Sequence, residues 1–242
     1  MVEQTSADAG GIPLVGLRDD IEGLSSALKS HQSRLIVGPA GIGKTRLVAE
    51  ALAVCGEPFV WIEKPLVLHD LLVRLAESLR CRSGRFADLR RATSVHLKPL
   101  ALNALRAAPQ CVILEDMPPA DPRMYRFLQE LYYVPAACLV VTLRSRARMG
   151  HLRKLLWDPG QRIELRPLAR QESLRLFEEA CRAFHLTSLD LGEFRRQVIT
   201  AARGNPGQIL EMCRKAARPE YRYGGRIKFA PLRIDLLSAF MP

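Results

Sequence analysis

One glycine-rich stretch, residues 38–45, constrains the fold of this chain more than any other part of the sequence. It follows the apolar run 35–37 and precedes residues 46–52, which have the composition of a helix. In a strand, glycine-rich turn and helix arranged in that order, the backbone N–H groups point inward and can surround a polyphosphate, and the start of the helix adds partial positive charge. The stretch therefore predicts a phosphate-binding loop in an α/β fold. Its residues are Gly38, Pro39, Ala40, Gly41, Ile42, Gly43, Lys44 and Thr45.

The last two residues of this loop predict the ligand more closely. Lys44 would reach the β- and γ-phosphates of a nucleoside triphosphate, and the Thr45 hydroxyl would be a ligand of Mg²⁺. The alternative is a chance glycine-rich turn before a helix, but the flanking strand and helix favour a nucleotide site. We therefore expect a polyphosphate nucleotide and Mg²⁺ at this loop, and the resemblance described below implies that the nucleotide is ATP.

A second candidate site element is the buried strand at residues 111–116, which ends in Glu115 and Asp116. Carboxylates at the carboxyl end of a strand lie at the edge where α/β sheets bind ligands. Beside a phosphate loop, one carboxylate would hold Mg²⁺ and the other would orient or deprotonate the attacking water. Alone, the pattern fits a helix cap equally well; downstream of a phosphate loop, it favours a hydrolytic site.

The strand at residues 137–142 ends in a polar and a basic residue, Thr142 and Arg144. Both are expected at the same edge of the sheet as Glu115 and Asp116. An ordinary solvated strand end is the alternative, and the shared edge favours a functional role.

Strands and helices alternate up to about Leu165, and only helical patterns follow. The strands at 35–37, 58–63, 111–116, 137–142 and 162–165 predict a five-stranded parallel sheet flanked by helices. Residues 171–184, 189–202 and 206–217 predict three helices, the last one capped by Asn205 with Pro206 in its first turn. Residues 221–229 predict a hairpin or a basic strand, and residues 233–240 a short helix. The expected domains are a disordered lead-in (1–11), an α/β core (12–165), a small all-α domain (166–218) and a basic tail (219–242).

The formal net charge of +11 is the one unusual feature of the composition. Basic residues gather in 80–98, in 144–154 and from residue 203 onward. Such clusters would attract a polyanion such as duplex DNA, or they are simply a basic surface; both interpretations stay open. The six cysteines form no C-x-x-C pair and the five histidines stand apart, which suits buried free thiols in a reducing cytoplasm better than disulfides or a metal site. No apolar run approaches membrane-spanning length, so no membrane partner is expected.

These motifs together resemble the ATPases of the AAA+ and STAND grouping over roughly residues 12–217. Residues 38–45 correspond to the Walker A motif and 112–116 to Walker B. Thr142 and Arg144 correspond to the sensor strand that reads the γ-phosphate. The resemblance also implies that the all-α domain is a helical lid, that Pro206 approaches the adenine, and that Val15, in the entry motif 14–16, packs on the base.

Three departures from this resemblance suggest slow turnover. Walker B has Glu115 in the metal position and Asp116 as the base, where Asp-Asp or Asp-Glu is usual, and the longer Glu side chain would loosen Mg²⁺. Leu17 stands where the entry motif usually has arginine. The early part of the last lid helix also lacks the arginine with which many AAA+ proteins sense the γ-phosphate. Arg146 or Arg148 would serve as a finger on a neighbouring subunit, or would simply be surface residues.

The sequence therefore predicts a switch that binds ATP and hydrolyses it slowly, with the lid moving in response to the γ-phosphate. One alternative is a DNA-associated AAA+ ATPase of replication or transposition, and another is a scaffold that holds nucleotide without hydrolysing it. Expected partners are ATP and ADP, duplex DNA in the first alternative, and either an ATP-dependent homo-oligomer or a separate effector protein. A metabolic nucleotide kinase fits poorly, because nothing resembles a clamp for a second substrate.

Overall fold

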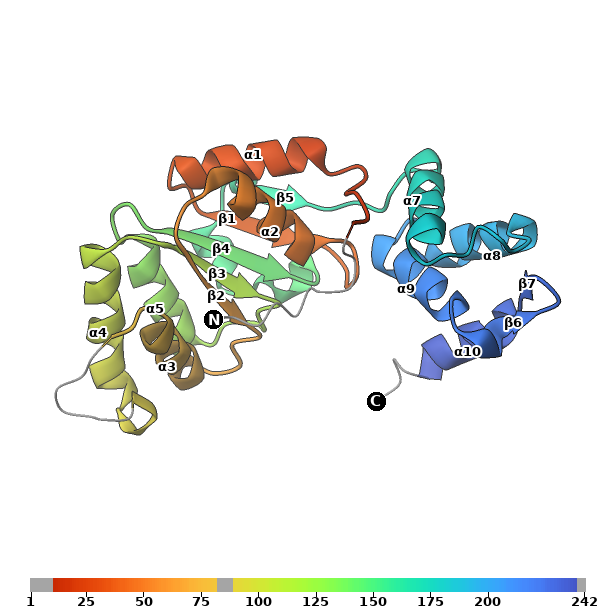
Figure 1. Ribbon diagram of the computed structural model, residues 1–242. Coiled ribbons are helices and arrows are strands. Elements are labelled where there is room, and N and C mark those ends of the chain that lie inside the picture. Colours follow the sequence, from red (N-terminus) through yellow and green to blue (C-terminus); the bar gives the residue numbers. More distant parts are fainter. Residues whose placement is uncertain (1–10, 82–88, 239–242) are drawn as a thin grey trace. The chain divides into compact units, whose positions relative to one another are not determined.

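The computed structural model describes residues 11–81 and 89–238 (Figure 1). The chain divides into two compact units. We call residues 19–39 and 44–165 the sheet unit, and residues 1–18, 40–43 and 166–242 the helical unit.

A five-stranded sheet forms the centre of the sheet unit. All its pairings are parallel, and the strand order is β2-β3-β4-β1-β5. The prediction of a five-stranded parallel sheet is confirmed. Because β4 lies between β1 and β3, the carboxyl ends of these three strands are adjacent. The strands are β1 (Arg34–Val37), β2 (Phe59–Glu63), β3 (Cys111–Glu115), β4 (Cys138–Leu143) and β5 (Arg162–Glu164).

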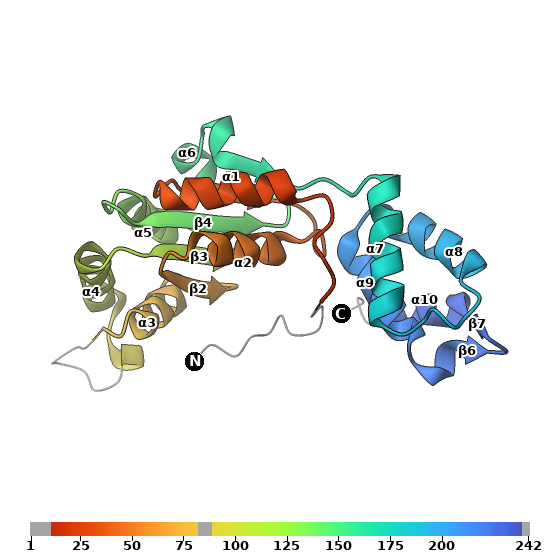
Figure 2. The same ribbon diagram turned by 45° about the horizontal axis from the view of Figure 1, so that its top comes forward.

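Helices cover both faces of this sheet, which is why its central strands are largely apolar. Side chains alternate between the two faces of a strand. Val112 and Leu114 of β3 pack in one buried cluster with residues of α3, α4, α5 and α6. Ile113, between them, is buried on the other face, where α1 and α2 lie (Figure 2). The helices are α1 (Arg18–Lys29), α2 (Lys44–Cys55), α3 (Leu68–Ser78), α4 (Ser94–Ala107), α5 (Pro122–Tyr132) and α6 (Leu152–Leu155), with short 3₁₀ turns η1 (Leu89–Arg91), η2 (Arg146–Met149) and η3 (Pro159–Gln161).

The helical unit has a core of its own. Phe177 of α7, Phe194 of α8 and Met212 of α9 are buried together in it, and Leu232 of α10 joins them. Ile12, in the N-terminal entry segment, is buried in the same cluster, although the predicted α/β core began at residue 12. The elements are α7 (Arg170–Ala183), α8 (Gly192–Ala202), α9 (Pro206–Ala216), η4 (Pro219–Tyr221), β6 (Arg222–Tyr223), β7 (Arg226–Ile227) and α10 (Phe229–Ser238).

Two helix ends show why the sequence signals worked. The Asp121 side chain accepts a hydrogen bond from the Met124 amide at 2.7 Å and caps α5, with Pro122 in the first turn. Asn205 caps α9 in the same way, through the Gln208 amide at 3.2 Å, followed by Pro206. In each case an orphan N–H of the first turn is satisfied, and proline stands where no donor is needed.

The prediction was less accurate around the short elements. The hairpin at 221–229 is present as β6 and β7, but α10 begins at Phe229, four residues before the predicted start. Helix α8 begins at Gly192 instead of 189, and α6 was not predicted. Residues 1–10 of the lead-in, residues 82–88 of the basic stretch 80–98 and residues 239–242 of the tail lie outside the described residues.

All six cysteines are free thiols, as expected, and four of them are buried. No helix in the described ranges combines the length and apolar character needed to cross a membrane.

Candidate functional site

The phosphate loop connects β1 to α2. Gly41 and Gly43 have φ angles of +76° and +107°, the left-handed region that glycine occupies without steric cost, so the loop can bend as the sequence requires. Lys44 is the first residue of α2, and its Nζ donates hydrogen bonds to the carbonyl oxygens of Gly38 at 2.7 Å and Pro39 at 2.9 Å. Burial lowers the pKa of Lys44, while the nearby Asp116 carboxylate acts in the opposite direction. A buried ammonium held by loop carbonyls is placed to meet an anion at this loop.

The next residue, Thr45, connects the loop to the end of β3. Its hydroxyl donates a hydrogen bond to Oε1 of Glu115. Glu115 Oε2 accepts a second hydrogen bond, at 2.9 Å, from the indole N–H of Trp61 on β2. The carboxylate is therefore fixed from both sides and lies against the hydroxyl.

This Thr45–Glu115 pair fits Mg²⁺. A hydroxyl and a carboxylate are hard oxygen ligands, and Mg²⁺ commonly takes only one or two protein ligands, with water and substrate phosphates completing its shell. Larger metal sites are not seen: in 11–81 and 89–238 no three His, Cys, Asp or Glu side chains come together to hold a metal ion.

Asp116 was predicted to be the last residue of the strand at 111–116. In the structure β3 ends at Glu115, and Asp116 lies in the turn that follows. Its φ of +48° is uncommon for a residue other than glycine. The Asp116 amide donates to the Thr142 hydroxyl at 2.8 Å, and the Met117 amide donates to the Thr142 carbonyl at 3.1 Å. Thr142 is completely buried. The end of β4 thus holds the turn that orients the Asp116 carboxylate.

The guanidinium of Arg144 donates hydrogen bonds to both oxygens of this carboxylate. Nε lies 2.8 Å from Oδ1 and 2.9 Å from Oδ2 of Asp116, and Nη2 lies 2.5 Å from Oδ2. These hydrogen bonds and the charge of Asp116 raise the pKa of Arg144, so the guanidinium stays charged. The Arg144 side chain is 47 % exposed and that of Asp116 is 16 % exposed. The arginine therefore reaches into solvent and could contact a ligand as well.

Within the helical unit, the start of α9 contacts the phosphate-loop residues 40–43. The Asn205 side-chain amide donates to the Ala40 carbonyl at 2.9 Å, and the Gly207 amide donates to the Gly41 carbonyl at 2.8 Å. Pro206, the predicted adenine neighbour, stands between these two residues. Val15 packs against the core of the same unit. Contact of Val15 and Pro206 with an adenine base stays a prediction.

Comparison of the backbone with solved structures gives the fold. The ORC1 protein of Aeropyrum pernix in complex with DNA matches 93 % of this chain and 66 % of its own, at 14 % identity and a TM-score of 0.67. A Walker-type ATPase of Pyrococcus abyssi matches 94 % of this chain and 74 % of its own, at 14 % identity and a TM-score of 0.65. A STAND protein with a tetratricopeptide repeat sensor from Pyrococcus horikoshii matches 95 % of this chain and 33 % of its own, at 16 % identity and a TM-score of 0.55.

The chain has the fold of the AAA+ and STAND ATPases. It spans about two thirds of the ORC1 chain and one third of the STAND chain. No protein-family model and no curated protein sequence matches it.

Within this AAA+ fold, the sheet unit brings together five of the residues singled out from the sequence. They are Lys44, Thr45, Glu115, Asp116 and Arg144, with Thr142 beneath them. Arg146, one of the two proposed finger residues, is paired with Glu164, at 2.5 Å between Nε and Oε1. Arg148 is exposed.

Trp61 is the site residue that sequence reasoning missed. In the sequence it is one aromatic residue in an apolar strand, and nothing near it indicates a polar partner. Its contact with Glu115 follows from strand order, because β2 pairs with β3 and Trp61 lies opposite Ile113, two residues before Glu115.

Proposed function

We propose that this chain is a nucleotide switch that binds ATP with Mg²⁺ and hydrolyses it slowly. The observation that carries the proposal is the placement of Lys44, the Thr45–Glu115 pair and the Arg144–Asp116 pair at the carboxyl ends of three adjacent strands. This is the edge at which α/β sheets bind their ligands, and these side chains supply the groups that ATP hydrolysis needs.

Each residue has a distinct role in the proposal. Lys44 and the loop amides bind the phosphates. Thr45 and Glu115 would hold Mg²⁺, which supplies neutralising charge on the phosphate oxygens when bound. Asp116 orients the attacking water and accepts its proton, and Trp61 keeps the Glu115 carboxylate turned toward Thr45.

We attribute slow turnover to the hydrogen bonds that Arg144 donates to Asp116. Both oxygens of the candidate base accept hydrogen bonds from the guanidinium, so the attacking water competes with the arginine for them. A γ-phosphate offers Arg144 another anion of suitable geometry. We therefore propose that Arg144 exchanges Asp116 for the γ-phosphate, which links the presence of ATP to the release of the base.

The contacts of α9 with residues 40–43 provide a route by which the helical unit would respond. A change in the loop backbone alters the acceptors of the Asn205 side chain and the Gly207 amide, which lie at the start of α9. A conformational response requires such a difference in contacts between the nucleotide states. The response of a lid to ATP is thus proposed to begin at these two hydrogen bonds.

Asp116→Asn tests the proposal most directly. Asparagine keeps the side-chain shape and tolerates a positive φ, so the turn after β3 is preserved while the base is lost. We expect kcat for ATP hydrolysis to fall by about a hundredfold or more, with ATP affinity retained when measured by calorimetry.

Lys44→Ala is the companion variant, because it is expected to abolish ATP binding itself. Full turnover in Asp116→Asn would contradict the proposed role of this carboxylate. ATP binding without turnover in the unaltered protein would instead support the scaffold alternative.

A second candidate function, DNA association, is favoured by a basic surface on the sheet unit. Five exposed cations lie on α5, η2 and α6, and none has an acidic partner among the described residues. The rings of Tyr125 and His151, 5.5 Å apart, connect α5 to the start of α6. The five cations are Arg123, Arg126, Arg148, Arg153 and Lys154.

A further inference from the structure

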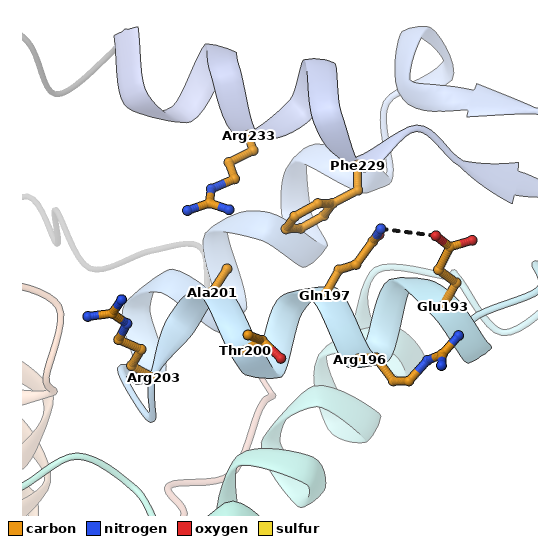
Figure 3. Close-up of a pocket in the computed structure, with 8 residues that line it drawn as sticks. All are labelled: Glu193, Arg196, Gln197, Thr200, Ala201, Arg203, Phe229 and Arg233. Carbon is orange, nitrogen blue, oxygen red and sulfur yellow. Dashed lines mark hydrogen bonds between the residues drawn. The ribbon is translucent and has the colours of Figure 1, made fainter.

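A hollow lined by three arginines, a glutamate and a phenylalanine, among other residues, lies within the helical unit, between α8 and α10. Its volume is about 680 Å³, within the range of small-molecule sites. Figure 3 shows the eight residues that line it. They are Glu193, Arg196, Gln197, Thr200, Ala201, Arg203, Phe229 and Arg233.

Three arginines give this hollow its charge. Arg196 and Arg203 lie seven residues apart on one face of α8 and its C-terminal cap, and Arg233 comes from α10. None of the three has an acidic partner in the described part of the chain. Other arginines of the same unit do have such partners: Arg182 with Glu179, Arg214 with Glu211, Arg218 with Glu220, and Arg226 with Asp190. The hollow thus gathers three cations and one carboxylate, Glu193, with which none of them forms an ion pair, and this excess of positive charge favours an anionic ligand.

Phe229 supplies an aromatic surface in the same hollow. Its ring is half-buried and packs edge-on against Phe194 of the core, with 6.1 Å between centroids and 67° between planes. The ring is therefore fixed in place while part of it lines the hollow, as a stacking surface requires.

The far end of the hollow carries a hydrogen-bond acceptor. Gln197 donates a hydrogen bond to Oε1 of Glu193 at 3.1 Å. In Figure 3, Arg203 and Arg233 point toward one end, Glu193 and Gln197 lie at the other, and Phe229 lies between these ends. The groups run from the cations Arg203 and Arg233, through the ring of Phe229, to the acceptor Glu193, and Arg196 lies at the acceptor end as well.

We propose that this hollow is a second nucleotide site, which binds a nucleoside phosphate. The phosphate would lie on Arg203 and Arg233, the base on Phe229, and an exocyclic amine of the base would donate to Glu193. Guanidinium forks match phosphate oxygens. An acidic peptide would use the arginines equally well but would bring its carboxylates toward Glu193 and leave Phe229 without a partner. None of the eight lining residues belongs to the phosphate loop, so the site would add a second ligand to the proposed switch.

The test uses the full chain carrying Lys44→Ala, which removes binding at the phosphate loop. AMP is the probe, and affinity is measured by calorimetry. We expect one AMP per chain, bound more tightly than UMP, which lacks an exocyclic amine, and more tightly than inorganic phosphate. Binding of a short single-stranded oligoadenylate with the same arginine dependence supports the site and shows that it also accepts a nucleotide within a strand.

Two substitutions and a matched control locate the binding. Arg203 has a φ of +48°, a conformation that glycine adopts freely, so Arg203→Gly removes the charge without straining the fold. We expect Arg203→Gly and Arg233→Ala each to weaken AMP binding by about tenfold. Arg195→Ala changes a residue of α8 outside the hollow, with the same loss of charge, and is expected to leave AMP binding unchanged.

Three results would overturn the proposal. The first is the absence of AMP binding to the Lys44→Ala protein while denaturant unfolding shows that it is folded. The second is an equal loss of binding in Arg195→Ala. The third is binding of polyglutamate without binding of AMP, which would assign the hollow to an acidic protein partner. None of these results bears on ATP hydrolysis at Asp116, so the two proposals fail separately.

Discussion

Thr142 is a buried residue that contacts the turn carrying a candidate catalytic group. Its hydroxyl accepts the Asp116 amide at the point where Asp116 has a positive φ. The resemblance had suggested direct reading of the γ-phosphate, which stays a prediction. The observed contact supports a positioning role, because it fixes the backbone that aims the Asp116 carboxylate.

Thr142→Val tests this positioning role. Valine has the same shape but leaves the Asp116 amide without its acceptor, so we expect the free energy of unfolding to fall by about 1–3 kcal/mol. We also expect kcat to fall more than ATP affinity. Urea unfolding and steady-state kinetics measure the two effects.

The control for this substitution is Thr142→Ser, which keeps the hydroxyl and loses one buried methyl group. It should retain more activity than Thr142→Val. Equal turnover in the valine and serine variants would show that the hydroxyl does not position Asp116.

At the scale of single residues, the sequence predicted those whose chemistry is tied to a local pattern. Lys44 and Thr45 follow the loop glycines, and Glu115 ends an apolar strand, so spacing alone indicates them. The ion pair between Arg144 and Asp116 was not predicted. It depends on the pairing of β3 with β4 in the sheet and on the turn that Asp116 adopts. Trp61 was missed for the same reason.

Among the elements, the turn from α8 to α9 is the most tightly constrained. Gly204 has a φ of +79°, and a Cβ at this position would lie 2.5 Å from the Leu168 carbonyl oxygen. The Gly204 carbonyl itself accepts the Leu168 amide at 2.8 Å. This glycine therefore fixes the approach of the α8–α9 turn to the segment that leads into α7.

Gly204→Ala should destabilise the protein, because the methyl group meets backbone atoms that have little room to move. We expect a loss of about 1–3 kcal/mol, measured by denaturant unfolding. The control is Gly23→Ala in α1, where nothing lies within 4 Å of the added Cβ. There the same substitution should stabilise by up to about 1 kcal/mol. A similar effect of both substitutions would contradict the close contact at Gly204.

The predicted bounds of strands β1, β3, β4 and β5 and of helix α7 agree with the structure to within one residue at each end. The cap Asn205 identified the start of α9, whereas the starts of α8 and α10 were misplaced by three and four residues. Helix α10 has no such signal: it starts at Phe229 because this residue and Leu232 pack into the core of the helical unit. Tertiary contacts of this kind cannot be read from local periodicity.

At the scale of the whole molecule, the remaining functional question is whether the basic surface of the sheet unit binds DNA. ORC1, one of the proteins with this fold, is described in complex with DNA. For this chain, DNA association is the proposal that rests on the five exposed cations of α5, η2 and α6. Salt dependence separates such binding from a surface that is merely basic.

If duplex DNA binds this surface, log Kobs should fall linearly with log salt, with a slope of about −0.9 per phosphate contacted. Replacing Arg148 and Arg153 together by alanine should make the slope less steep by about 2. Fluorescence anisotropy across a salt series measures both slopes. Replacing Arg182 and Arg214, which are paired with glutamates, should leave the slope unchanged. No binding at low salt would exclude the DNA-associated alternative.

The close approach of Gly207 to the backbone of Gly41 limits which residues can occupy position 207. A Cβ at Gly207 would lie 2.8 Å from both the Cα and the carbonyl oxygen of Gly41, and no change of rotamer can make room there. At 14 % identity to ORC1, this chain has a similar fold with a largely different set of side chains. Any distant relative that keeps this contact must keep a glycine at its equivalent of residue 207. Residue 207 is therefore limited to glycine by the backbone contact itself, whatever ligand the neighbouring loop holds.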